Sequence, residues 1–397
     1  MNEEKLGIMK KTAPLFLIIF SMSCSLSPKD ELTKVLQNSP FYEKKMLFKG
    51  ERFPNLVVAK DGSIIATWGE EKCVSRRSID GGNSWEPQVY IGSGINGGGL
   101  TLDENSGEII AFIEKEHPPS TLKCYRSRDI GKTWDRIEID ILPDRNGITP
   151  SMHMNEHGIS LKSGKYRGRL IRPSRFYNAN SSSERKLMYS SAKEKMWKEQ
   201  YTNAVYSDDG GKTWQTSNPF PAKGTGEAAL VELSDGTIYY NSRRHFSTDG
   251  LNPRMRHIAT STDGGHSWKD LYVSKELPDG EQDRDYGLMA GLDRLPYEGH
   301  DILIFSNIES DSGRKNGTVW LSFDGGTSWP VKKRIENEGF KYSSLAVGRK
   351  NTASEGYIYL LYETGKKDNI NAYGGGIIAR FNLSWLMEGK DINQFLK

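Results

Sequence analysis

Short apolar runs separated by glycine-rich, polar turns recur through most of the chain. Four examples rich in isoleucine, tyrosine and tryptophan are residues 63–68, 107–112, 237–240 and 357–362. Residues of these types favour β-strands. Apolar and polar positions alternate only roughly within the runs, as they do in strands that are buried on both faces. The pattern therefore predicts an all-β chain of many short strands joined by tight turns.

One eight-residue pattern occurs five times among these runs. It begins with Ser-x-Asp, has glycine at its fifth position and ends with a Ser or Thr followed by Trp. Successive Asp residues are 49, 80, 54 and 61 positions apart. A repeat of about 50 residues is in the range of β-propeller blades. The copies are residues 78–85, 127–134, 207–214, 261–268 and 322–329, and their Asp residues are Asp80, Asp129, Asp209, Asp263 and Asp324.

Each copy of the pattern predicts a tight turn with local stabilisation. Glycine tolerates the positive φ that such turns need, and an Asp carboxylate can accept hydrogen bonds from nearby backbone N–H groups. The hydroxyl residue adds a second local hydrogen bond, and the Trp can pack beside the turn. A structural role for the five Asp residues follows more readily from this chemistry than a catalytic one.

Composition and charge narrow the class of protein. The chain has 397 residues, of which 54 are basic and 51 acidic, with no clustered basic block, and this balance argues against a nucleic-acid partner. A hydrophobic content of 36% argues against a polytopic membrane protein. Three cysteines exclude a disulfide scaffold and form no CxxC pair for zinc, so no metal site or cofactor is expected. Cys73 and Cys124 are expected to be separate buried thiols.

The first residues have the pattern of a targeting segment. Lys10 and Lys11 precede an apolar run, 13–20, and small residues lead to Cys24. The run is too short for a helix that spans a bilayer. Its end resembles a bacterial lipoprotein signal, which implies that residues 1–24 form a signal peptide and that Cys24 becomes lipidated. A plain cleaved signal and an uncleaved anchor are the alternatives.

Residues 25–45 are then expected to be a polar tether. These features predict an exported bacterial protein of the cell envelope, which meets the membrane only through its lipid anchor.

The five repeated segments are identified as Asp-boxes, and with them the chain resembles the sialidase (neuraminidase) superfamily. The resemblance implies that residues 46–397 form a six-bladed β-propeller of four-stranded antiparallel blades, with five Asp-box turns and one blade without a box. In that family the box lies between the outer strands of a blade, away from the active site. The longest step between boxes contains an insertion, 151–191, whose polar run 178–185 is expected to be a loop. Residues 380–386 and onward predict a closing strand followed by a short helix.

Three arginines match the family's carboxylate-binding positions. Sialic acids carry a carboxylate on the anomeric carbon, and arginine binds carboxylates with a permanently charged, bidentate fork. Arg52 lies in an Arg-x-Pro motif before a strand, and Arg243 is the arginine of an Asn-x-Arg motif that follows a strand and an Asp-Gly turn. Arg314 precedes the fifth box, with Lys315 next to it as an alternative.

The resemblance also implies a nucleophile and its base. Tyr342, in a Tyr-Ser pair, matches the catalytic tyrosine, and Glu227 matches the catalytic carboxylate. Glu363, in a Tyr-Glu pair, matches the residue that orients Arg52. A neutral tyrosine can attack a carbon beside a carboxylate without charge repulsion, but its ordinary pKa of about 10 requires a base. The implied reaction proceeds through a covalent intermediate and retains configuration, the scheme of tyrosine-nucleophile sialidases.

The chain departs from the family's pattern at the general acid/base. The family carries an Asp on a loop of the opening hairpin, whereas residues 68–77 contain none. Glu70 or Glu71 could substitute, since the departing oxygen needs a proton from an acid of raised pKa. His153, Glu156 and His157 are more distant alternatives, and loss of cleavage is another.

The sequence therefore predicts an exo-glycosidase, expected to be monomeric, that removes a terminal sialic acid or a related 2-keto-3-deoxy sugar acid. Its partners would be sialylated or other acidic glycans. Hydrolysis of another anionic sugar and a non-catalytic glycan-binding propeller remain alternatives.

Overall fold

The computed structural model describes residues 39–177, 198–297, 299–366, 369 and 372–396. The predicted signal peptide, the lipidation of Cys24 and the polar run 178–185 lie outside these residues. The regular secondary structure of the described part is almost entirely β-strand, as the apolar pattern predicts. Among these residues, no helix is long and apolar enough to cross a bilayer.

The first half of the described chain forms three sheets of short, mainly antiparallel strands, in which only β11 pairs in parallel, with β15. The first sheet contains β2 (Asn55–Val58), β3 (Ile64–Trp68), β4 (Lys72–Ser78) and β5 (Val89–Ser93). The second contains β6 (Ile95–Asn96), β7 (Thr101–Leu102), β8 (Ile109–Glu114), β9 (Leu122–Ser127) and β10 (Asp135–Ile137). The third contains β12 (Ile159–Ser160), β13 (Leu170–Phe176), β14 (Tyr201–Ser207), β15 (Thr213–Thr216) and β11 (Asp140–Ile141), with the short helix η1 (Gly164–Tyr166).

The second half forms one four-stranded sheet and one seven-stranded sheet, both antiparallel. The four strands are β16 (Thr225–Glu232), β17 (Ile238–Arg244), β18 (Met255–Ser261) and β19 (Lys269–Pro278). The seven are β20 (Gly291–Tyr297), β21 (His300–Ile308), β22 (Lys315–Ser322), β23 (Val331–Val347), β24 (Ile358–Gly365), β25 (Tyr373–Phe381) and β1 (Tyr42–Lys49).

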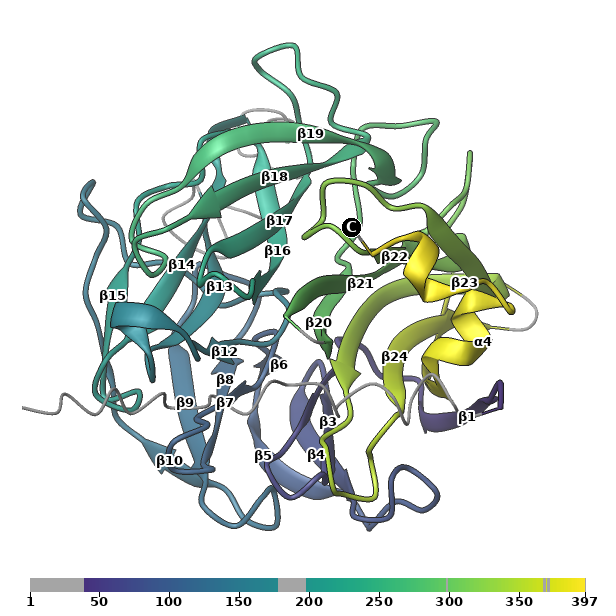
Figure 1. Cartoon of the computed structure of the whole chain (residues 1–397). Coiled ribbons are helices and arrows are strands. Elements are labelled where there is room, and N and C mark those ends of the chain that lie inside the picture. The colour runs from purple at the N-terminus through teal and green to yellow at the C-terminus, as the bar shows by residue number, and fades with distance from the viewer. Residues whose placement is uncertain (1–38, 178–197, 298, 367–368, 370–371, 397) are drawn as a thin grey trace, which may run out of the picture.

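The seven-stranded sheet divides within its long strand β23. The first part of β23, up to Gly339, pairs with β22, whereas the part from Phe340 onward pairs with β24. The described chain thus contains six groups of strands. Each group contacts the next through β4 and β6, β7 and β12, β13 and β16, β16 and β20, β20 and β23, and β23 and β2. Figure 1 shows these groups arranged around a common centre.

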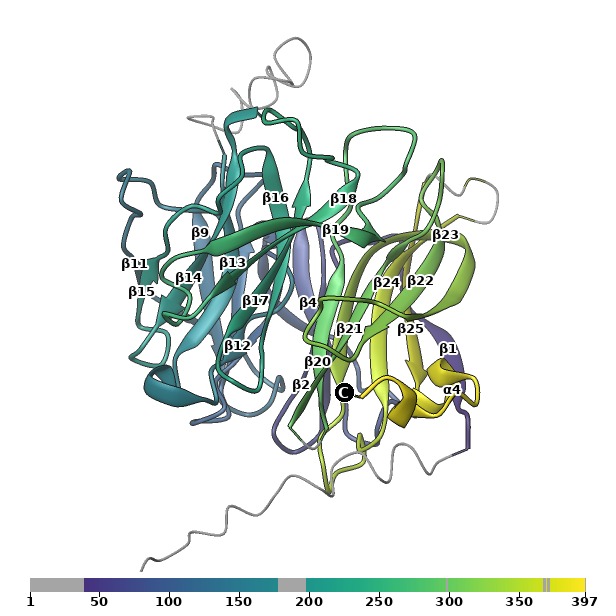
Figure 2. The ribbon, with the colours of Figure 1, turned by 45° about the horizontal axis from the view of Figure 1, so that its top comes forward.

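The two ends of the described chain meet in one sheet. Strand β1 pairs antiparallel with β25, with Tyr42 opposite Phe381. The sheet therefore begins at Tyr42, within the range predicted as tether and before the predicted domain start at 46. After β25, helix α4 (Leu383–Met387) begins at once, because the Asn382 side chain accepts a hydrogen bond from the Trp385 backbone N–H. A second short helix, η2 (Ile392–Gln394), follows, and Figure 2 shows α4 beside β25 and β1.

The apolar runs form the core between neighbouring groups of strands. Between the first two sheets, for example, Val57 and Ile65 belong to one cluster with Ile109 and Ile113. Burial of such side chains stabilises the packed sheets by about 25 cal/mol for each Å² removed from water. Cys73 and Cys124 are buried and are not joined in a disulfide, which confirms the prediction of two separate thiols.

All five Asp-boxes lie between the third and fourth strands of a sheet. In the box after β18, Asp263 accepts hydrogen bonds from the Ser267 backbone N–H at 3.0 Å and the Ser261 hydroxyl at 2.7 Å. The other four boxes repeat these two bonds. Burial opposes ionisation of Asp263, but the hydrogen bonds outweigh it and lower the pKa of the carboxyl. The predicted structural chemistry of the boxes is therefore present.

Candidate active site

One end of the sheets carries the predicted site residues. Because the strands run antiparallel, the start of each first strand lies beside the end of the second. Glu227 is near the start of β16, and Arg243 is near the end of β17, brought back by the hairpin at Asp235. Arg52 precedes β2, Arg314 precedes β22, and Glu363 is near the end of β24. Tyr342 lies within β23, just after the point where the pairing of that strand passes from β22 to β24.

Tyr342, Glu227 and Arg243 form a buried hydrogen-bonded cluster. The Tyr342 hydroxyl donates to Glu227 Oε1 at 2.9 Å, and Arg243 Nη1 donates to Tyr342 Oη at 3.1 Å. The same arginine forms a short ion pair with Glu227 Oε2. Tyr342 and Glu227 are 115 positions apart in the chain, and their side chains nevertheless meet within hydrogen-bond reach.

The other two predicted arginines flank the Tyr342 ring. The guanidinium carbon of Arg52 lies 5.6 Å from the ring centroid, and that of Arg314 lies 5.7 Å from it. The structure thus brings the three arginines to one tyrosine from three distant stretches of chain. Arg314, rather than Lys315, makes this ring contact.

Glu363 holds Arg52 in place. Its Oε1 lies 3.3 Å from Arg52 Nε and accepts a hydrogen bond from the Phe53 backbone N–H at 3.0 Å. Glu363 is fully buried. The predicted pairing of Glu363 with Arg52 is therefore present in the structure.

The electrostatics keep a neutral phenol beside an ionised carboxylate. Burial, and then the charge of Glu227, raise the pKa of Tyr342. Burial also opposes ionisation of Glu227, but the positive charges of Arg243 and Arg175 outweigh it and lower the pKa of this carboxyl. Because Glu227 is ionised, its carboxylate can accept the phenol proton when the tyrosine oxygen attacks.

Four residues without a recognisable local motif complete the site. Arg175 Nη1 lies 3.4 Å from Glu227 Oε1 and adds a second positive charge beside it. The Tyr286 carbonyl accepts a hydrogen bond from Arg243 Nε at 2.8 Å, and Tyr373 stacks 3.7 Å from the Arg52 guanidinium. Glu281 Oε1 lies 3.8 Å from Arg314 Nε. Arg175 lies in the predicted insertion, 151–191, and none of the four residues was expected at the site, because these contacts depend on tertiary structure alone.

Lys341, next to the nucleophile candidate, is an additional cation at this end. Its Nζ donates to the Ala372 carbonyl at 2.6 Å and lies 4.2 Å from the Tyr373 ring centroid. Burial lowers the pKa of Lys341 to about 8, and the nearby charges of Arg314 and Arg52 act in the same direction. The amine is therefore less firmly protonated than an ordinary lysine.

The acid candidates Glu70 and Glu71 lie in the short loop between β3 and β4. Both are exposed. Glu70 is close enough to Arg52 to favour its charged form, so its carboxylate lies near one side of the site. The Glu71 backbone carbonyl accepts a hydrogen bond from the Gly94 N–H, which anchors the loop to the neighbouring chain.

The more distant candidates Glu156 and His157 perform structural roles. Glu156 is fully buried and accepts hydrogen bonds from the Ser344 hydroxyl at 2.8 Å and from the Asn55 amide at 2.9 Å. His157 Nε2 lies 3.1 Å from the Leu345 carbonyl. Neither contacts Tyr342 or Glu227 through these bonds. His153, by contrast, pairs with His117, with 3.0 Å between His153 Nε2 and His117 Nδ1.

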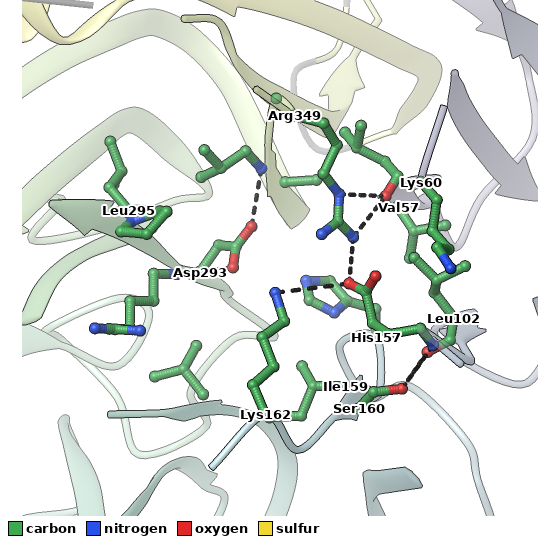
Figure 3. A pocket seen from close by; sticks show the side chains of 18 of the residues that line it. Val57, Lys60, Leu102, His157, Ile159, Ser160, Lys162, Asp293, Leu295 and Arg349 are labelled. Atoms are coloured by element: carbon green, nitrogen blue, oxygen red, sulfur yellow. Dashed lines mark hydrogen bonds and ion pairs between the residues drawn. The ribbon is translucent and has the colours of Figure 1, made fainter. Parts of the chain in front are cut away.

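A separate cavity of about 450 Å³ lies at the opposite end of the inner strands (Figure 3). His157 lines it, together with Val57, the last residues of β23 and charged side chains. The charges there pair with one another: Glu104 lies 2.7 Å from Arg349 and 3.6 Å from Lys162. Tyr342, Glu227 and Arg243 do not line this cavity. The candidate active site is therefore placed at the other end of the strands, where a phenol, a carboxylate and guanidinium groups meet.

Among the described residues, no three His, Cys, Asp or Glu side chains lie close enough together to hold a metal ion. The cluster around Tyr342 instead combines a phenol, a carboxylate and several guanidinium groups. The cluster can bind an anion through its guanidinium groups and transfer a proton between Tyr342 and Glu227.

Comparisons with known proteins agree with this description of the chain. The model of the BNR repeat-like domain matches residues 97–360. A sialidase of Micromonospora viridifaciens is 30% identical over 380 residues, which are 85% of this chain and 52% of that protein. A sialidase of Bacteroides fragilis is 25% identical over 362 residues, 79% of this chain and 60% of the relative. The chain thus spans little more than half the length of these relatives.

Solved structures share the fold. A Hadza microbial sialidase, Hz136, superposes with a TM-score of 0.61 at 22% identity, covering 85% of this chain and 66% of the other. The leech intramolecular trans-sialidase, solved with 2,7-anhydro-Neu5Ac, has a TM-score of 0.63 at 17% identity and covers 85% and 69%. At these identities the likeness concerns the fold.

Proposed function

Because the chain belongs to the family of BNR repeat-like domains, we propose that it is an exo-sialidase, a retaining glycoside hydrolase that removes a terminal sialic acid from glycans. The observation that carries the proposal is the 2.9 Å hydrogen bond from the Tyr342 hydroxyl to Glu227, inside a cluster of three arginines. The sialidases among the relatives support the same reading.

We further infer that the six groups of strands are the blades of a six-bladed β-propeller. Each group contacts its neighbour, and the group that contains β1 contacts the first. Five groups carry an Asp-box at the turn between their outer strands, and the group of β24, β25 and β1 carries none. In this arrangement the site lies at one mouth of the central axis and the boxes lie at the other face.

The three arginines would bind the substrate carboxylate. Arg243 is held by Glu227 and the Tyr286 carbonyl, and Arg52 is held by Glu363. Guanidinium groups fixed in this way lose little side-chain entropy when a carboxylate arrives.

In the proposed reaction, the Tyr342 oxygen attacks the anomeric carbon while its proton passes to Glu227. A neutral phenol is suited to this carbon, because an attacking carboxylate would be repelled by the substrate carboxylate. Water then displaces Tyr342, which recovers its proton from Glu227. Two displacements retain the configuration of the sugar.

The test uses a fluorogenic 4-methylumbelliferyl glycoside of N-acetylneuraminic acid. The wild-type protein is expected to release the fluorophore, and the Tyr342→Phe variant is expected to lose at least about 10²-fold in kcat/KM. Tyr272→Phe, which alters an exposed tyrosine of β19, serves as the matched control and should leave the rate unchanged. Binding of free sialic acid without turnover would favour a glycan-binding module instead.

A related keto-sugar acid is the second candidate substrate. The loop between β3 and β4 consists only of Gly69, Glu70 and Glu71, which leaves room beside Arg52 for a different sugar ring. Parallel assays with Kdn and Kdo glycosides decide this point, since faster release from either would replace N-acetylneuraminic acid as the preferred substrate.

We also propose export to the cell envelope, with a lipid anchor on Cys24 and with sialylated glycans as the partners of a monomeric enzyme. Metabolic labelling with a fatty acid should mark the wild-type protein and not a Cys24→Ala variant. Labelling of both proteins, or of neither, would contradict the anchor.

A further inference from the structure

A glycosidase must deliver a proton to the departing oxygen, and general acid–base catalysis of this kind contributes about 10²- to 10⁴-fold to the rate. Tyr342 and Glu227 are already committed to the attack on the sugar carbon. The two glutamates of the loop between β3 and β4 are exposed. A side chain held in place by packed neighbours at the same end of the sheets is better suited to this transfer.

Two histidines form a pair at the same end of the fold as Tyr342. His117 lies in the turn between β8 and β9, and His153 lies in the segment before β12. By the antiparallel order of the strands, both positions belong to the end where β2 and β16 begin. His117 Nδ1 and His153 Nε2 are 3.0 Å apart, and the two ring centroids are 4.8 Å apart at an interplanar angle of 77°.

The Phe53 ring connects this pair to the nucleophile. Its centroid lies 6.2 Å from that of His117, 6.1 Å from that of His153 and 6.4 Å from that of Tyr342. Phe53 has a φ of 63°, in the left-handed region that non-glycine residues seldom adopt. Glu363 and the Asn96 amide hold its backbone N–H and carbonyl in this position.

A second chain of contacts leads from the pair to the base. The His153 ring lies 6.2 Å from the Tyr177 ring, and the Arg175 guanidinium lies 4.3 Å from Tyr177. Arg175 in turn forms the 3.4 Å ion pair with Glu227. The histidine pair is therefore connected by side-chain contacts to Tyr342 through Phe53, and to Glu227 through Tyr177 and Arg175.

We propose that the His117–His153 pair is the general acid and base of this enzyme. His117, the less buried member, transfers the proton, and His153 is a positioning residue that holds the His117 ring through the shared hydrogen bond. The assignment rests on the proposed glycosidase function. Imidazole has an ordinary pKa of about 6.5, so it can give and take a proton at neutral pH.

With this pair, every proton transferred in the two steps has a donor and an acceptor. In the first step the protonated pair gives its proton to the glycosidic oxygen, the bond between that oxygen and the anomeric carbon breaks, and the electron pair leaves with the oxygen. The Tyr342 oxygen bonds to the carbon, and its proton moves to Glu227. In the second step the neutral pair takes a proton from water, whose oxygen bonds to the carbon while Tyr342 departs and recovers its proton.

The test compares two substrates that differ in their need for an acid. A 4-nitrophenyl sialoside has a good leaving group and needs little protonation, whereas sialyllactose has a poor one. For His117→Ala, kcat/KM on sialyllactose should fall by about 10²- to 10⁴-fold, and kcat/KM on the aryl sialoside should stay within about threefold of the wild type. The retained aryl activity also demonstrates that the variant is folded.

The positioning role of His153 has its own readout. His153→Ala should show the same selectivity between leaving groups with a smaller loss, and His153→Gln should restore part of it, because its amide can still hydrogen-bond to His117. Azide, which needs no base, should accelerate turnover of the aryl sialoside by His117→Ala and yield the glycosyl azide.

Three outcomes overturn the assignment separately. Equal losses on both substrates in His117→Ala, or no loss on either, would remove the pair from proton transfer. If Glu70→Gln lost kcat/KM on sialyllactose but not on the aryl sialoside, while His117→Ala kept wild-type kcat/KM on both, Glu70 would be the acid. A wild-type protein that cleaves neither sialoside would refute the proposed function itself, which is a result distinct from the first two.

Discussion

Replacing Glu227 by glutamine tests the centre of the site, because the change removes one negative charge and preserves the shape of the side chain. Glu227 is 4% exposed and Arg243 is 1% exposed, so their charges are almost completely removed from water. The carboxylate also accepts the Tyr342 proton in the proposed reaction, through the 2.9 Å hydrogen bond. The variant should therefore lose both activity and stability.

The loss of activity follows from the role of Glu227 as base. Removal of a general base lowers the rate by about 10²- to 10⁴-fold, which corresponds to about 3–5 kcal/mol of transition-state stabilisation. Steady-state kinetics with the fluorogenic sialoside measure this loss as kcat/KM. A value for Glu227→Gln within about tenfold of the wild type would refute the assignment of Glu227 as base.

The loss of stability follows from the charges left behind. Arg243 and Arg175 would remain buried without their shared anion, and breaking a buried pair in this way costs about 3–5 kcal/mol. Chemical denaturation monitored by tryptophan fluorescence gives the free energy of unfolding. Unchanged stability would mean that these arginines do not depend on Glu227 for compensation.

Glu232→Gln provides the matched control, because it makes the same substitution on the same strand, β16. Glu232 lies at the other end of that strand and accepts hydrogen bonds from the backbone N–H groups of Lys162 and Ser163. Its kcat/KM should equal that of the wild type, which separates the chemistry of Glu227 from a general effect of removing a glutamate charge.

Three further predictions follow from other parts of the structure. Glu363→Gln should raise KM for the sialoside about tenfold with a smaller change in kcat, because Arg52 loses the charged ion-pair partner that orients it. An unchanged KM would contradict that role. The pKa of Lys341 is lowered to about 8 in the folded protein and is about 10.4 in the unfolded chain, so the stability of the protein should increase as pH rises from 8 toward 10. Thermal unfolding scans of Lys341→Met should not show this increase, and an increase that persists in the variant would exclude Lys341 as its source. Asp263→Ala should lower the free energy of unfolding by about 1–3 kcal/mol and leave kcat/KM unchanged, because the hydrogen bonds of the Asp-box are remote from the site. A loss of activity in the folded variant would contradict a purely structural role of the box.

The parts of the site that depend on local chain geometry could be predicted from sequence. The Asp-Gly turn after β16 returns Arg243 to Glu227, and the register of the hairpin places Ala228 opposite Ser242. The contact of Tyr342 with these residues joins positions 115 residues apart, and only the resemblance to a known family suggested it. Two acid candidates, Glu156 and His157, are instead bound to the backbone and side chains around Leu345.

Other contacts left no signal in the sequence at all. Tyr286 packs on Arg243 and His117 meets His153 from turns with no recognisable motif, and Tyr373, the first residue of β25, packs on Arg52. A turn residue has few local constraints, so its neighbours depend on how the sheets are placed relative to one another.

The sequence by itself determined the strands, the five box turns and the hairpin that pairs Glu227 with Arg243, because propensity, glycine φ and carboxylate hydrogen bonds act over a few residues. Only the tertiary structure decided which charges face each other across the site. The packing of the six groups of strands against one another is a property of the whole core, and it places the ends of distant strands beside Tyr342. The pKa values of Tyr342 and Glu227 follow from that placement, because burial and opposite charges shift them only once the sheets have assembled.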